Sequence, residues 1–159
     1  MWKTVKPYII SVLAALAVGG ISALLTKGNM DFLETINKPP LSPPSFLFPI
    51  VWTVLFILMG ISSAYVYKNK KRNPDAASTG LTVYIFSLAV NFFWSIIFFN
   101  LRAFMFSFIW LVLLWILIII TIREYAKVSR GAAYLQVPYL LWVTFAGYLN
   151  FMIYIMNQS

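Results

Sequence analysis

Tryptophan and asparagine are the residues of this chain whose spacing indicates a site. Three pairs of residues stand three or four positions apart, so each pair lies on one face of a helix. The pairs are Trp52 and Phe56, Asn91 and Trp94, and Trp142 and Ala146. Aromatic rings stack on flat apolar molecules, and a carboxamide offers hydrogen-bond donors and an acceptor. The pattern therefore indicates that these helix faces can line an apolar slot with one polar group.

Most catalytic chemistry is excluded by the composition. The chain has no cysteine and no histidine, which rules out thiol nucleophiles, imidazole bases and Cys/His metal sites. Its four carboxylates, Asp31, Glu34, Asp75 and Glu124, fall in predicted loops. Acid–base catalysis inside a membrane pocket is therefore not expected, and no metal site is predicted.

The elements that position the candidate residues are apolar segments. The 159-residue chain is 62% hydrophobic and 10% charged, whereas soluble domains carry roughly 25% charged residues. A helix needs about 20 residues to cross the hydrocarbon layer. Five uncharged segments approach or reach this length: residues 7–26, 46–67, 80–100, 104–122 and 134–156. We therefore predict an all-α membrane protein, a single domain over residues 1–159 built as a bundle of five transmembrane helices.

The distribution of Lys and Arg predicts the orientation of this bundle. One side holds Lys3, Lys6, Lys68, Lys70, Lys71, Arg72, Arg123, Lys127 and Arg130, and the other holds Lys27, Lys38 and Arg102. Because cytoplasmic loops are enriched in these residues, we expect the N-terminus in the cytoplasm and the C-terminus outside. The formal charge of +8 is thus a topology signal and does not indicate a nucleic-acid-binding face. A cleaved signal peptide is the alternative for the first segment, but its apolar run is longer than a typical one.

The helical rise per residue gives an expected depth for each candidate residue, and most of them fall in the outer half of the membrane. At 1.5 Å per residue, Trp52 and Phe56 lie roughly 9 and 15 Å below the outer surface. From the inner surface, Asn91, Trp94 and Trp142 lie at roughly 16, 21 and 12 Å. Two roles remain open for Asn91, because a buried carboxamide needs a partner: a bond to another helix, or a bond to the polar edge of a ligand.

Two further patterns allow alternative interpretations. Small residues recur at every fourth position of the first helix, at Ser11, Ala15, Gly19 and Ala23. Such a stripe lets another helix approach closely, either within the bundle or at the interface of a dimer. Tryptophans near helix ends, Trp2 and Trp110, fit an interfacial belt. Trp94 and Trp115 fit either the core or the lipid-facing surface.

A proline-rich stretch, KPPLSPP at residues 38–44, lies between the first two predicted helices. Proline lacks the backbone N–H and fixes φ, so the stretch cannot be the interior of a helix. It is expected to form a stiff, extended loop at the outer end of the bundle.

Four stretches together resemble a known family. They are KPPLSPP, FPIVWTVLFILMGISSAYV at 48–66, NFFWSIIFF at 91–99 and VPYLLWVTFAGYLN at 137–150. In order and spacing they are similar to the tryptophan-rich sensory protein and translocator protein family, formerly the peripheral benzodiazepine receptor. The resemblance implies a bacterial member in the cytoplasmic membrane, with five helices, usually homodimeric, and a pocket closed by the first loop. Members bind porphyrins, haem, sterols in animals, and isoquinoline and benzodiazepine drugs, and some bacterial members are reported to degrade protoporphyrin in light.

Carried over residue by residue, the resemblance implies a set of ligand contacts, with the proline loop as a stiff lid. The set is Phe32, Pro43, Trp52, Phe56, Asn91, Trp94, Trp142, Ala146 and Leu149. Phe32 stands where the family commonly has tyrosine, so the lid lacks a hydroxyl group. The animal sterol motif is incomplete, because no Lys or Arg follows Leu149 and Tyr154.

We therefore expect a membrane protein that binds porphyrin or another flat hydrophobic ligand and acts as a sensor, regulator or transporter of porphyrins. Its expected partners are that ligand, the bilayer and a second copy of the chain; no cofactor is required. Lys27 or Lys38 would meet the porphyrin carboxylates at the mouth. Metal-free porphyrin is favoured, because without histidine the iron of haem lacks a strong axial ligand.

An enzyme-like activity is the alternative function. Light and oxygen would degrade the bound porphyrin, with the indoles of Trp52 and Trp142 exchanging electrons with the excited ring. A transporter that works by alternating access is less well supported, because no inverted repeat and no helix broken at mid-membrane is evident in the sequence.

Overall fold

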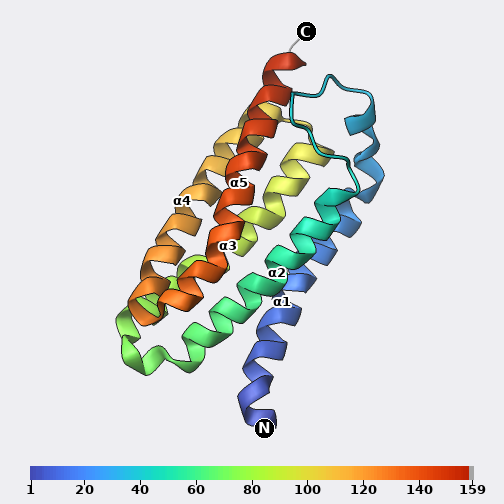
Figure 1. The fold of residues 1–159 in the computed structure, drawn as a ribbon. Coiled ribbons are helices and arrows are strands. Elements are labelled where there is room, and N and C mark those ends of the chain that lie inside the picture. The colour runs from blue at the N-terminus through green and yellow to red at the C-terminus, as the bar shows by residue number, and fades with distance from the viewer. Residues whose placement is uncertain (158–159) are drawn as a thin grey trace.

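Five long helices form the molecule, which we describe from a computed structural model. It describes the backbone of residues 1–157 and their side chains except that of Leu33. The helices are α1 (Trp2–Thr26), α2 (Leu47–Lys68), α3 (Pro74–Ser95), α4 (Phe104–Val128) and α5 (Arg130–Met156). All are long and apolar enough to cross a membrane (Figure 1). The predicted fold class, a helical membrane protein with a proline-rich loop between the first two helices, is confirmed.

The bundle pairs α4 with α3 and α5, and α2 with α1 and α5. Glycines permit the closest approaches between helices. A Cβ atom on Gly60 of α2 would lie 2.6 Å from the backbone Cα of Val12 on α1, and one on Gly80 would lie 2.8 Å from the Tyr125 ring. Ala15 is completely buried, and Gly19 abuts the ring of Phe56. These two members of the small-residue stripe therefore pack within the bundle, which is the first of the two alternatives.

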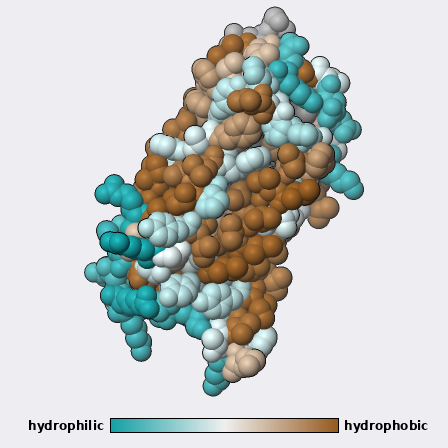
Figure 2. Space-filling view, viewed as in Figure 1, coloured by the Kyte–Doolittle hydropathy of each residue, from teal (hydrophilic) through white to brown (hydrophobic). Residues whose placement is uncertain are grey.

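A broad hydrophobic surface separates two hydrophilic ends of the molecule (Figure 2). Large apolar side chains such as Ile10, Leu24, Ile109 and Leu141 are exposed on it. Exposed apolar side chains in this number are characteristic of a surface that faces lipid. The described part of the chain is therefore a multi-pass membrane protein.

At the end of the bundle opposite the first loop, the helices extend beyond the predicted uncharged segments. Helix α3 begins at Pro74 instead of residue 80, since the Asn73 side chain accepts a hydrogen bond from the N–H of Ala76 and proline suits the first helical position. Helix α5 begins at Arg130 instead of residue 134, with the Ser129 side chain as its N-cap. Helix α1 begins at Trp2 instead of residue 7, and α4 continues to Val128 instead of residue 122. Lys and Arg are good helix formers, so helical backbone continues into the charged ends.

The C-terminal end of α3 winds into a π-helical segment, η4 (Ile96–Asn100), which was not expected from the sequence. The backbone N–H of Leu101, directly after this segment, donates to the carbonyl of Ile96, five residues earlier, at 3.1 Å. Asn100 then ties this segment to the end of α1, donating to the carbonyl of Leu25 at 3.1 Å and accepting from Asn29 at 2.8 Å. The wider turn thus fixes the C-terminal end of α3 against the start of the first loop.

The first loop contains two short 3₁₀ turns, η1 (Lys27–Asn29) and η2 (Asp31–Glu34), before its proline-rich part. The proline-rich part lies outside regular secondary structure, as predicted. Figure 1 shows it crossing from α1 to the C-terminal end of α5 and back to the start of α2. Asn37 exchanges hydrogen bonds with Asn157 at 3.1 and 3.0 Å, and the Tyr148 hydroxyl donates to the carbonyl of Pro40 at 2.8 Å. The loop is therefore fastened to α5.

Candidate ligand-binding site

A cavity of about 330 Å³ lies in the half of the bundle next to the first loop. Its walls come from α1, α2, α3 with η4, and α5, and Met30 of the first loop contributes to the end nearest that loop. Seven of the nine predicted contact residues line it: Trp52, Phe56, Asn91, Trp94, Trp142, Ala146 and Leu149. The structure thus brings together residues from three helices that the sequence could place only at similar depth.

Aromatic rings form the wall that α2 and α5 share. The ring centroids of Trp52 and Phe56 lie 5.7 Å apart, at an interplanar angle of 31°. The Trp52 ring also meets the Tyr139 ring edge to face, with 6.2 Å between the centroids. Phe48 packs edge to face on Trp142 at 5.8 Å. Offset and edge-to-face arrangements are the favourable geometries for aromatic pairs. The two indoles are therefore held by neighbouring rings and not by the membrane interface.

Gly19 of α1 lies against the ring of Phe56, where a Cβ atom would clash with the ring. Gly20 has open space beside it, and both glycines line the cavity. The lack of side chains on this part of α1 therefore leaves room beside the aromatic wall.

The opposite wall is held by a hydrogen-bonded group around Asn150. Its carboxamide oxygen accepts from the indole N–H of Trp94 at 3.1 Å and from the Ser107 hydroxyl at 3.0 Å. Its amide donates to the carbonyl of Phe104 at 2.9 Å. One side chain thus joins α3, α4 and α5. Its role was missed in the predicted contact set, although a carboxamide one helical turn beyond Ala146 is a signal for it.

Asn91 is 4% exposed, lines the cavity and donates to the Tyr139 hydroxyl at 2.8 Å. The helix-to-helix hydrogen bond, one of its two alternative roles, is therefore present. A carboxamide has two N–H groups and an oxygen with two lone pairs, so this bond uses part of its capacity. Asn91 retains groups that a ligand in the cavity can contact.

Trp142 differs from Trp94 in its polar group. Its indole nitrogen is buried, and among the residues that the structure describes it has no hydrogen-bond partner. A buried donor without a partner is costly. The Trp142 ring lines the cavity, but its nitrogen has almost no accessible surface there, so an acceptor atom on a ligand reaches this donor only if the ring turns.

The structure departs from the sequence-based expectation at Phe32 and Pro43, because the described lining of the cavity includes neither residue. The turn η2 directs the Phe32 ring into an aromatic cluster, 6.1 Å from Phe98 and 5.8 Å from Phe104. The Phe32 ring therefore packs against Phe98, which lines the cavity, and is not itself part of the described lining. Pro43 lies in the part of the loop that the Tyr148 bond to Pro40 holds over α5.

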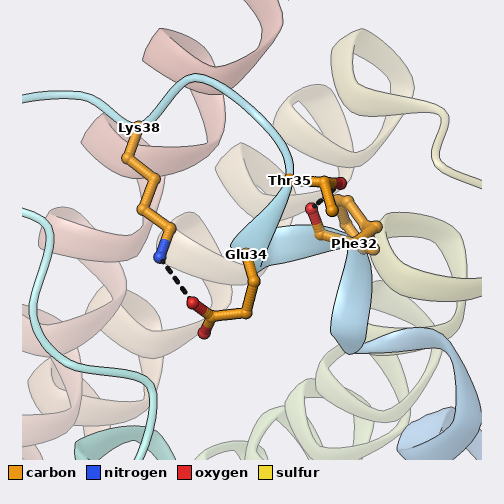
Figure 3. Close-up of polar contacts among 4 residues, drawn as sticks. All are labelled: Phe32, Glu34, Thr35 and Lys38. Atoms are coloured by element: carbon orange, nitrogen blue, oxygen red, sulfur yellow. Dashed lines mark hydrogen bonds and ion pairs between the residues drawn. The ribbon is translucent and has the colours of Figure 1, made fainter.

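The two lysines expected at the mouth lie outside the described lining of the cavity. Lys38 pairs with Glu34 at 3.4 Å on the exposed side of the loop, with the Phe32 ring on the other side of the turn (Figure 3). Neither Lys38 nor Lys27 is among the lining residues, and the described wall carries no charged side chain. The cavity is thus an apolar chamber with a few amide, hydroxyl and indole groups.

The remaining tryptophans do not line the cavity. Trp110 donates to the carbonyl of Val90 at 2.7 Å, and Trp115 donates to the Thr144 hydroxyl at 2.9 Å on the lipid-facing surface. Trp2 is largely exposed at the start of α1. Of the two tryptophans without an assigned place, Trp94 is in the core and Trp115 faces lipid.

Fold and cavity together define a class: a helical membrane protein with a small intramembrane chamber walled by aromatic residues. Comparison with known proteins places the chain within a family. The TspO/MBR family profile matches residues 11–156, and the chain belongs to this family.

Curated relatives match along nearly the whole chain. The chain is 37% identical to the tryptophan-rich protein TspO of Chlorobaculum tepidum, over 99% of both chains. It is 34% identical to the protein CrtK of Rhodobacter capsulatus, over 96% of this chain and 93% of CrtK. It is 31% identical to the translocator protein of Bos taurus, over 88% of this chain and 83% of the bovine protein. The resemblance found in the four sequence stretches is confirmed.

Proposed function

We propose that the chain is a membrane receptor for a flat hydrophobic ligand, with metal-free porphyrin as the favoured ligand, and that it acts as a sensor or regulator of porphyrins. The observation that carries this proposal is the placement of Trp52 and Trp142, from α2 and α5, on the wall of one chamber. Aromatic faces of this kind stack on a conjugated ring. Asn91, which lines the chamber, supplies a polar contact at the ring edge.

The size and charge of the chamber constrain how a porphyrin would bind. A volume of about 330 Å³ is at the lower end of the range for small-molecule pockets. The apolar wall suits the macrocycle, whereas its carboxylates must remain at the mouth, because an unpaired charge in an apolar chamber is costly. Movement of the first loop would then accompany binding.

Iron in the ring is not favoured. Among the described lining residues, the thioether of Met30 is the one soft donor, and thioethers alone are weak axial ligands. The described residues also form no cluster of three His, Cys, Asp or Glu that would hold another metal. The proposed ligand is therefore a metal-free ring.

Filling the chamber tests the proposal. Ala146 lines the cavity and is buried, so Ala146→Phe would occupy the space between the aromatic walls. Titration of the purified protein with protoporphyrin in the dark should show a loss of affinity of tenfold or more. Ala89→Phe adds the same ring on an exposed position of α3 and should bind like the unmodified protein. Equal affinity of Ala146→Phe and the control would place the ligand outside this chamber.

A second candidate function is light- and oxygen-dependent degradation of the bound porphyrin. The observation that favours it is the position of the Trp52 and Trp142 indoles on the chamber wall, where they would contact the ring. In this proposal an indole gives one electron to the light-excited porphyrin, and the reduced ring passes that electron to dioxygen, which becomes superoxide. The oxidised indole then takes an electron back from the porphyrin, so the ring is oxidised by one electron, the indole is restored, and dioxygen is the oxidant. Loss of porphyrin absorbance under illumination, compared with the dark, distinguishes this activity from binding.

We also propose a bacterial cytoplasmic membrane as the location, with the N-terminus in the cytoplasm, and a homodimer as the assembly. The distribution of nine and three cationic residues between the two ends supports the orientation. A reporter fused after Ser159 should be active only outside the cytoplasm, and cross-linking in native membranes should trap a species of twice the mass. Activity of the reporter in the cytoplasm would reverse the orientation, and an exclusively monomeric species would remove the dimer.

A further inference from the structure

The end of the bundle opposite the first loop is strongly cationic. Its connections and helix ends carry nine cationic side chains: Lys3, Lys6, Lys68, Lys70, Lys71, Arg72, Arg123, Lys127 and Arg130. The carboxylates at this end are Asp75 and Glu124, which leaves a net charge of +7 out of the chain's +8. We name these nine side chains the basic rim.

Hydrogen bonds join the three parts of the basic rim into one surface. The Lys68 ammonium group donates to the carbonyl of Thr4 at 2.9 Å, which connects the end of α2 to the start of α1. The Arg72 guanidinium donates to the carbonyl of Val128 at 3.5 Å, which connects the α2–α3 turn to the end of α4. The positive charge therefore spans the end of the bundle and is not confined to one loop.

Tyrosine rings hold several of these cations at the level of the helix ends. Lys70 lies 4.3 Å from the ring centre of Tyr67, and Lys68 lies 5.4 Å from that of Tyr8. Tyr67 is 51% exposed, so this corner presents an aromatic ring together with an ammonium group. Tyrosine is enriched where membrane headgroups meet hydrocarbon.

Exposed apolar side chains begin directly beside the basic rim. Ile10 is 56% exposed one helical turn beyond Lys6, and Ile120 is exposed three residues before Arg123. In Figure 2 the hydrophilic atoms at this end are followed by residues of intermediate hydropathy and then by the hydrophobic surface. A molecule that matches both features has an anionic group attached to long apolar chains.

We propose that the basic rim is a binding surface for anionic phospholipids, with the phosphate at the Lys and Arg side chains and the acyl chains along the exposed apolar residues. Charge complementarity gives the preference for anionic over zwitterionic headgroups. The adjacent apolar surface gives the preference for a lipid over a soluble anion. This inference is independent of the ligand in the chamber.

Lipid retention by the purified full-length chain tests the proposal. The protein is exchanged into micelles with equal amounts of phosphatidylglycerol and phosphatidylcholine of the same acyl chains, and the retained lipids are counted by native mass spectrometry. We expect at least threefold more phosphatidylglycerol than phosphatidylcholine, and loss of this excess in 0.5 M salt, because salt screens exposed charges. Equal retention of the two lipids would overturn the proposal.

Two matched variants locate the surface. Lys70→Gln/Lys71→Gln removes two charges from the basic rim, and Lys27→Gln/Lys38→Gln removes two from the other end. The first should lose at least half of the phosphatidylglycerol excess, and the second should keep it. Equal losses in both variants, once thermal unfolding shows that both are folded, would mean that overall charge and not the rim selects the lipid. Displacement of phosphatidylglycerol by soluble glycerol phosphate would also contradict the proposal, because a lipid site requires the acyl chains.

Discussion

The indole nitrogen of Trp94 donates to the carboxamide oxygen of Asn150 at 3.1 Å, which fixes a wall of the chamber across α3 and α5. The same carboxamide bonds Ser107 and the carbonyl of Phe104 on the α4 side. The orientation of Trp94 in the chamber wall therefore depends on Asn150, whose hydrogen bonds in the described structure go to protein groups.

Replacing Asn150 with leucine should destabilise the bundle. The change leaves the Trp94 N–H without its acceptor, whereas the Ser107 hydroxyl still has the carbonyl of Phe104 at 2.9 Å. We expect the unpaired indole N–H to cost about 1–3 kcal/mol. It should also weaken porphyrin binding, because the Trp94 ring is no longer held. Unfolding in mixed micelles, followed by tryptophan fluorescence, measures the first effect.

Thr144→Val is the matched control for Asn150→Leu. It removes the bond between Thr144 and Trp115 on the exposed surface and should change stability by no more than about 0.6 kcal/mol, the average for interhelical bonds in membranes. If Asn150→Leu were as mild as this control, the Asn150 bonds would not be what holds the wall.

The contact between α1 and α2 predicts opposite results for two glycines. In Gly60→Ala, the new Cβ would lie 2.6 Å from the Cα of Val12, so the helices must separate, at a cost of about 1–3 kcal/mol. In Gly20→Ala, the new Cβ meets nothing within 4 Å, and stability should be unchanged or slightly raised. Thermal unfolding followed by circular dichroism compares the two, and equal stability would show that α1 is free to move away from α2.

The attachment of the first loop to α5 should govern ligand release. Tyr148→Phe removes the hydroxyl that donates to the carbonyl of Pro40. A net hydrogen bond is worth about 0.5–1.5 kcal/mol, so porphyrin dissociation should accelerate roughly 2- to 10-fold. Stopped-flow displacement measures this rate. Tyr154→Phe, whose hydroxyl makes no bond to the loop among the described residues, should dissociate at the original rate, and identical rates for the two variants would mean that the bond does not restrain the lid.

Substituting both chamber indoles separates binding from photochemistry. Phenyl retains most of the aromatic contact, so Trp52→Phe and Trp142→Phe should each lose on the order of 1 kcal/mol of porphyrin affinity. Phenylalanine is much harder to oxidise than tryptophan, so the double variant at saturating porphyrin should bind the ring but not consume it under light. The measurement is the decay of porphyrin absorbance.

Trp110→Phe/Trp115→Phe is the control for these indoles, because neither residue lines the chamber. It should degrade porphyrin at the original rate. Unchanged decay in the Trp52 and Trp142 double variant would rule out indole chemistry, and absence of decay in the unmodified protein would leave binding alone.

Local sequence patterns were sufficient to predict the five helices and two of the residue pairs that line the chamber. Hydropathy and charge predicted five membrane helices, because each such helix satisfies its own backbone hydrogen bonds and needs only length and apolarity. Helical spacing placed Trp52 with Phe56, and Trp142 with Ala146, on common faces, and these residues do line one chamber. The N-cap residues of α3 and α5, Asn73 and Ser129, are also local signals. The predicted starts of these two helices followed the limits of the uncharged segments instead.

Tertiary structure decided which faces meet and which polar groups pair. Spacing along a helix does not specify the neighbouring helix, so the bonds of Asn91 to Tyr139 and of Trp94 to Asn150 followed only from the packing. The inward turn of Phe32 had the same origin, because the aromatic cluster that receives it comes from η4 and α4, about 70 residues farther along the chain. Close contact at Gly60 and Val12 sets how α1 and α2 cross, and the chamber forms in the space that this packing leaves.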